Sequence, residues 1–279
     1  MNALADLFIR ELHASLSHSL EFYIHDPALH PDPFCHRDPS MVTPAQWYVH
    51  KSGGTRKGLD VTCGYTGVHG GILIRGLDGV RGPSKCTDVI MAALGVSSAK
   101  DLDARKQEFA LVPRDQVTLE SGLVLAPIPR HLREPVHVSP RVGLAPTSAP
   151  RAPRGHRPAM PDLKTQLTYV FAPYRYQIDP SRAPHKHMAA MGQYEGRAAG
   201  MMSVRDWQLE LQVSAAAGKA WEEELREGQA DADVKTLVAG VAKNGNAKAW
   251  MRLRGWYGAN RETWETETRV ESDLSDVDV

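Results

Sequence analysis

Short runs of β-branched and aromatic residues between residues 21 and 77 constrain the fold of this chain more than any other feature. Each run has the length and composition of a β-strand. The glycine pairs Gly53-Gly54 and Gly70-Gly71 punctuate the runs, as turns between antiparallel strands do. The runs are Phe22-Tyr23-Ile24, Trp47-Tyr48-Val49, Leu59-Asp60-Val61-Thr62 and Gly71-Ile72-Leu73-Ile74. The sequence therefore predicts an antiparallel sheet in this part of the chain.

Helical patterns flank these strands. Apolar residues recur every three or four positions within residues 2–19, which predicts an amphipathic helix. Ser84 and Gly95 are placed as the caps of a short helix over residues 86–94. Beyond residue 188 the composition turns to Ala, Glu, Lys and Trp, and five of the six tryptophans follow residue 200, so this region can bury a core of its own. Its expected helices lie near residues 203–229, 231–243 and 246–256.

These patterns predict an α+β fold with no internal repeat. We expect a single mixed domain over residues 1–190, in which residues 167–171 form the last strand, and a helical extension over residues 191–267. Residues 145–158 are rich in Pro, Ala and Arg with little to bury, and predict a mobile basic connector. Residues 268–279 are acidic and predict a disordered tail.

The net charge of zero conceals a strong segregation of charge. Residues 1–50 carry 2 basic and 6 acidic side chains (−4), residues 51–200 carry 21 and 12 (+9), and residues 201–279 carry 10 and 15 (−5). The total by itself argues against a nucleic-acid partner, but a basic middle segment suits contact with phosphates. The chain has three cysteines, no secretory leader pattern and no apolar run of membrane-spanning length. We therefore expect a soluble intracellular protein without a membrane partner.

Several short motifs follow one another in order between residues 8 and 176. They are Arg10-Glu11-Leu12, Leu20-Glu21-Phe22-Tyr23, His36, Trp47-Tyr48-Val49-His50, Ile72-Leu73-Ile74-Arg75-Gly76-Leu77, Gly82-Pro83-Ser84-Lys85, Ser139-Pro140-Arg141-Val142-Gly143 and Tyr174-Arg175-Tyr176. In this order the chain resembles the alkyladenine (3-methyladenine) DNA glycosylases. The resemblance implies a single domain with a curved antiparallel sheet, a nuclear location and a role in base excision repair.

The activity that this resemblance implies is hydrolysis of the N-glycosidic bond of an alkylated or deaminated purine flipped out of DNA. Glu21 would be the catalytic general base that activates water, and Tyr23, two residues along the same strand face, would stack on the base. The other residues of the base pocket would be His36, His50, Asp60 and Arg75. No metal or other cofactor is expected, because the carboxylate supplies the base and an alkylated purine leaves readily.

The residues expected to contact the DNA backbone are cationic. They are Lys51, Arg56, Lys57, Lys85 and Arg141. Two positions depart from the family. Gly53 stands where the family has an intercalating tyrosine, and Asp60 stands where it has an asparagine that excludes guanine. Glycine cannot wedge into a base stack, so the cationic hairpin around Gly53 suits phosphates or single strands.

Other interpretations of the sequence remain open. The chain could be a nucleic-acid-binding protein that kept the fold and lost the chemistry, or an N-glycosidase acting on a nucleoside or on RNA. The helical extension could be a protein interaction module on a monomeric protein. A zinc site is disfavoured, because the spacings of His25, His30, Cys35 and His36 fit no common structural site. Asp26, Asp32 and Asp38 each precede a proline, which is typical of turns.

Overall fold

A computed structural model describes residues 19–50, 57–77, 79–106, 135–146, 161–183, 185–193 and 203–275, without the side chains of Asn244 and residues 262–275. The chain divides into two compact units. The first extends to Val138 and includes Pro173–Asp179. The second contains Ser139–Ala149, Met160–Ala172 and the chain from Pro180 onward. The expected boundary near residue 190 therefore differs from this division. The expected N-terminal helix and most of the basic connector lie outside the described residues.

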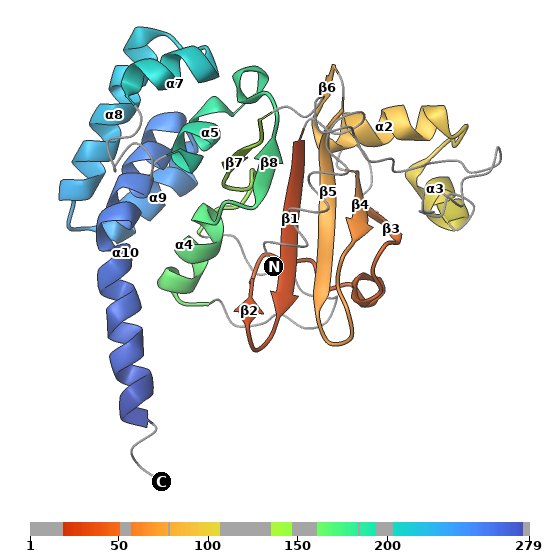
Figure 1. Ribbon diagram of the computed structural model, residues 1–279, viewed down its shortest axis with the longest axis horizontal. Coiled ribbons are helices and arrows are strands. Elements are labelled where there is room, and N and C mark those ends of the chain that lie inside the picture. The colour runs from red at the N-terminus through yellow and green to blue at the C-terminus, as the bar shows by residue number, and fades with distance from the viewer. Residues whose placement is uncertain are drawn as a thin grey trace. The chain divides into compact units, whose positions relative to one another are not determined.

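The predicted antiparallel sheet is confirmed, and it is open and curled (Figure 1). Its strands follow the order β3 (Trp47–His50), β4 (Gly58–Thr62), β5 (His69–Leu77), β1 (Ser19–Asp26), β8 (Arg175–Gln177) and β7 (His137–Ser139). Two short strands extend it, since β2 (His30–Pro31) pairs with β1 and β6 (Val80–Arg81) pairs with β5. Together with the helices, this sheet confirms the α+β class.

One face of the sheet carries the apolar core of the first unit. Two helices, α2 (Pro83–Ala93) and α3 (Ala99–Arg105), pack their apolar side chains on it. The core residues include Leu20, Val49, Leu59, Val61, Ile72, Ile74, Ile90 and Leu102. Helix α2 begins at Pro83, earlier than predicted, because the fixed φ of proline suits the first helical position. Burying alternate residues here leaves the intervening ones on the opposite face.

Apart from residues 139–146, the residues that the structure describes in the second unit are mainly helical. Its elements are η5 (Pro180–Arg182), α4 (Leu163–Phe171), α5 (Lys186–Gly192), α7 (Val204–Leu211), α8 (Ala215–Ala230), α9 (Val234–Asn244) and α10 (Ala247–Ser275). Helices α8 and α10 approach very closely, since a Cβ added at Gly255 would lie 2.0 Å from the carbonyl oxygen of Leu225. None of the described helices is both long enough and apolar enough to cross a bilayer.

Two sequence predictions in this unit are corrected. Residues 167–171 form the end of α4 and not a strand, because the Asp162 carboxylate accepts a hydrogen bond from the Thr165 amide and caps a helix there. The ring of Phe171 then packs at 5.0 Å from that of Tyr257 in α10. The acidic tail, which was expected to be disordered, is helical as far as Ser275. The sequence after Gly258 contains no glycine or proline that would end the helix.

Candidate functional site

The face of the sheet opposite the apolar core is polar. Residues directly opposite each other on paired strands project from the same face. Such pairing joins five residues in one row across the sheet, namely Tyr48, Asp60, Leu73, Glu21 and Arg175. Four of these five side chains are polar, and the row brings together residues separated by more than a hundred positions in the sequence. We take this face, with the loop residues that contact it, as the candidate site.

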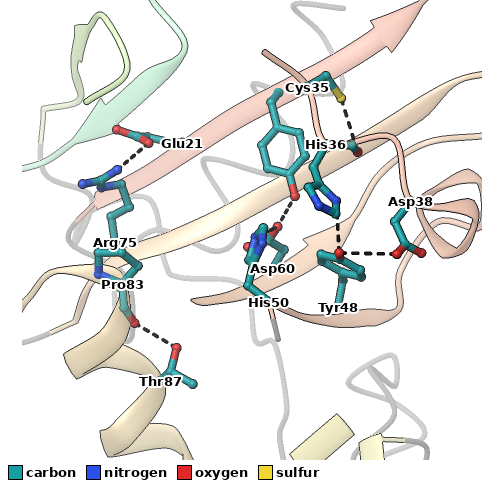
Figure 2. A network of polar contacts seen from close by, with 11 residues as sticks. Glu21, Cys35, His36, Asp38, Tyr48, His50, Asp60, Arg75, Pro83 and Thr87 are labelled. Carbon is teal, nitrogen blue, oxygen red and sulfur yellow. Dashed lines mark hydrogen bonds and ion pairs between the residues drawn. The ribbon is translucent and has the colours of Figure 1, made fainter. Parts of the chain in front are cut away.

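Glu21 is held in this face by arginine. Its side chain is buried, and Nη1 of Arg75 donates a hydrogen bond to its Oε2 at 2.8 Å (Figure 2). Arg75 is the extra residue of a β-bulge, since Leu20 pairs with Ile74 while Ser19 pairs with Gly76. A bulge redirects one side chain relative to its strand neighbours. The irregular register therefore allows Arg75 to reach a carboxylate on the adjacent strand.

A second arginine lies on the other side of the same carboxylate. Nε of Arg175 lies 4.0 Å from Oε1 of Glu21 and donates a hydrogen bond to the Ser19 hydroxyl at 3.1 Å. Burial lowers the pKa of Arg175 to about 10; the Glu21 carboxylate opposes this shift, while the charges of Arg75 and Arg81 add to it. Arg175 belongs to the Tyr174-Arg175-Tyr176 motif of the family resemblance, but it was not among the predicted site residues.

Asp60 organises a second cluster on β4. It is fully buried, and its Oδ2 lies 2.7 Å from Nε2 of His50 (Figure 2). The same oxygen accepts a hydrogen bond from the Tyr23 hydroxyl. Gly71 makes room for Tyr23, because a Cβ at this position would lie 2.3 Å from the phenol oxygen. Burial first, and then the Asp60 carboxylate, raise the pKa of Tyr23 well above its ordinary value. Tyr23 is therefore a neutral donor.

Three rings lie close together beside this cluster. The centroids of His36 and His50 are 5.6 Å apart, and that of Tyr48 lies 5.6 Å from His36 and 5.1 Å from His50. The Tyr48 hydroxyl lies 3.0 Å from Nδ1 of His36 and donates to Asp38 at 3.5 Å (Figure 2). Asp38 also caps η1 (Pro39–Val42) by accepting from a backbone amide, which confirms one predicted Asp-Pro turn.

The predicted site residues thus fall into three groups. Six of them, Glu21, Tyr23, His36, His50, Asp60 and Arg75, belong to the networks of this face. Among the predicted phosphate contacts, Lys57 pairs with Asp88, Lys85 is exposed on α2, and Arg141 is buried in the second unit. Lys51 and Arg56 lie outside the described residues, as does Gly53. Gln177, a buried amide opposite Ser19, was not among the predicted site residues.

Chemically, this face offers a carboxylate held by guanidinium groups, two imidazoles and two phenols. Such a set can move protons and hold a planar polar ligand. Within the described parts of the chain, no group of three or more His, Cys, Asp or Glu side chains is arranged to hold a metal ion.

The fold and this face define the class of protein as an α+β protein with a polar, arginine-buttressed sheet face. Comparison with protein-family models, curated proteins and solved structures found no match.

Proposed function

We propose that this chain is a monofunctional DNA glycosylase that hydrolyses the N-glycosidic bond of an alkylated or deaminated purine. The observation that carries the proposal is the position of Glu21. This buried carboxylate accepts a hydrogen bond from Arg75 and shares a sheet face with Tyr23, while three further rings lie on the same face. This clustering of residues from four separate segments supports the proposal.

In the proposed reaction the target nucleotide leaves the base stack, because water cannot reach C1′ of a stacked nucleotide. Glu21 accepts a proton from water while the water oxygen bonds to C1′. The bond from C1′ to the purine nitrogen breaks, and its electron pair leaves with the base, which is neutral if the purine was alkylated. Arg75 fixes the orientation of the Glu21 carboxylate. Tyr23, His36 and His50 supply ring faces and polar groups for the base.

Release of free base from alkylated duplex and single-stranded oligonucleotides tests this function directly. Glu21→Gln should lower the rate about 10²–10⁴-fold, the range for loss of a general base. Glu223→Gln, an exposed carboxylate on α8, is the matched control and should match the parent. Circular dichroism should show that both variants are folded. A parent protein that is folded but releases no base from any alkylated substrate would contradict the proposal.

A second candidate is a nucleic-acid-binding protein without catalytic activity. It is favoured by the engagement of Tyr23 and His50 with Asp60, which occupies the polar ends of two rings that would otherwise meet a base. If this candidate is correct, the parent protein binds oligonucleotides and releases no base. Glu21→Gln then leaves oligonucleotide binding unchanged and also releases no base. Parallel assays on RNA and on free nucleosides separate both candidates from an N-glycosidase with another substrate.

A further inference from the structure

Two buried side chains on β8 contain polar atoms without hydrogen-bond partners. Arg175 is 5% exposed and Gln177 is 2% exposed. Within the described residues, Nη1 of Arg175 and both Nε2 and Oε1 of Gln177 have no partner. Folded proteins pair nearly all buried polar atoms, and those left over need a partner that the chain does not supply. These two residues thus place three unpaired polar atoms on one short strand, where a ligand could supply the missing hydrogen-bond partners.

Both side chains belong to the polar face of the sheet. Arg175 is directly opposite Glu21, and Gln177 is directly opposite Ser19, so all four project from the same face. The Ser19 hydroxyl accepts from Nε of Arg175 at 3.1 Å, which fixes one edge of the guanidinium. Nη1 of Arg175 remains available as a donor, on the same strand face as the Gln177 amide.

The charged groups around Arg175 favour binding of an anion. The charges of Arg75 and Arg81 both act on the Arg175 guanidinium, and Glu21 is the carboxylate that pairs with Arg75 and Arg175. Arg75 already bonds to Glu21 at 2.8 Å. The group therefore carries more positive than negative charge, and a second anion would complete it.

We propose that Arg175 and Gln177 form an oxyanion site for a phosphate group. A guanidinium fork matches the geometry of phosphate oxygens, and Nε2 of Gln177 supplies another donor. Oε1 of Gln177 accepts from an O–H or N–H group of the same ligand. The phosphate belongs either to a nucleic-acid backbone or to a free nucleotide, which share this chemistry. The site stands independently of hydrolysis at Glu21.

Isothermal titration calorimetry with inorganic phosphate tests this site on the full chain. Gln177→Leu keeps a similar volume and removes the unpaired amide, so the fold should be at least as stable while phosphate affinity falls about tenfold or more. Arg175→Lys keeps the charge and loses the fork, and should weaken binding similarly. Arg226→Gln removes an exposed arginine on α8 and serves as the control for general electrostatics. It should bind phosphate as the parent does.

Failure of the parent to bind phosphate, or equal affinity in the parent and in Gln177→Leu, would overturn the proposal. Displacement of a short oligonucleotide by phosphate assigns the site to a nucleic-acid backbone, whereas binding of adenosine monophosphate without such displacement assigns it to a free nucleotide. Either result supports the oxyanion site. Base release is measured separately, so phosphate binding without base release would leave this site standing while the glycosylase proposal falls.

Discussion

Gly71 is the position where the smallest change should most disturb the polar face. The ring of Tyr23 crosses β5 at this glycine to reach Asp60 on β4. A Cβ at Gly71 would lie 2.3 Å from the phenol oxygen and 2.5 Å from Cζ, distances that no real contact of this kind adopts. The φ of Gly71 is not positive, so alanine meets no backbone strain there. Gly71→Ala should therefore act only by displacing the Tyr23 ring.

The expected cost follows from two effects. Losing a hydrogen bond to a charged partner costs about 1.5–3 kcal/mol, and it leaves the buried Asp60 carboxylate with His50 as its remaining hydrogen-bond partner among the described residues. Forcing an extra methyl group into a packed region costs about 1–3 kcal/mol. Alanine recovers about 0.5 kcal/mol or more through its lower chain entropy. The sum predicts that Gly71→Ala lowers the free energy of unfolding of the first unit by about 1.5–5.5 kcal/mol.

Native-state hydrogen exchange on peptides from β1 and β5 measures this free energy in the full chain, separately from the helical unit. The background Tyr23→Val provides the decisive comparison, because it removes the ring and keeps a good strand residue. In that background Gly71→Ala should be neutral or slightly stabilising, a coupling of about 2.5 kcal/mol or more. Equal destabilisation by Gly71→Ala with and without the ring would refute the reasoning.

Three further predictions concern pH and helix packing. Because burial and Asp60 raise the pKa of Tyr23 above 10.0, stability is complete below pH 10.0 and falls as the pH rises beyond it, which an alkaline unfolding titration should show. Burial, and then the charge of His185, lower the pKa of His187 from 6.5 to about 4, so between these two pH values only the unfolded chain gains a proton at this residue. The stability of the helical unit, followed by tryptophan fluorescence, should therefore fall as the pH drops from 6.5 to about 4. Gly255→Ala should destabilise the same unit by about 3 kcal/mol or more by forcing α8 from α10, whereas Gly240→Ala should stabilise it by about 0.5–1 kcal/mol.

Each of these predictions has a matched comparison. Tyr23→Phe should remove most of the alkaline dependence, and an unchanged alkaline profile would assign it to another group. His187→Gln should flatten the acid profile of the helical unit. Gly240 has no atom within 4 Å of an added Cβ, so it reports helix propensity without a clash. Equal effects of alanine at Gly240 and Gly255 would show that close approach of the helices does not limit stability.

Local periodicity made the central strands predictable. The alternation around Glu21, Val49, Val61 and Ile72 is a property of neighbouring residues, and each of these segments is a strand. Residues 167–171 are also rich in β-branched and aromatic residues, but form a helix. Their buried side chains recur at helical spacing, and the Asp162 cap begins the helix earlier in the chain. In residues 167–171, helix capping and tertiary packing outweigh the intrinsic strand propensity of the side chains.

The site was predictable only where the sequence determines which face a residue occupies. Tyr23 follows Glu21 by two residues, so a shared face follows from strand geometry alone. Arg75 reaches Glu21 through a bulge, and the sequence carries no sign of which residue will be the extra one. Gln177 is an ordinary polar residue until the register of β8 places it opposite Ser19 and buries it. Long-range strand pairing, and not local pattern, creates that part of the face.

On the proposed function, the arrangement of Tyr23 also bears on which bases the protein would accept. Its ring is 8% exposed, with Gly71 against it and Cys35 and Tyr48 in the same packed cluster. A base that stacks on this ring must displace packed side chains or release Tyr23 from Asp60. Giving up a hydrogen bond to a charged group would weaken binding about 10–100-fold. A base that itself donates an N–H to Asp60 recovers this loss, because Oδ1 of Asp60 has no partner within the described residues and Oδ2 then keeps only His50. The buried carboxylate therefore favours bases that present a hydrogen-bond donor over those that present only acceptors.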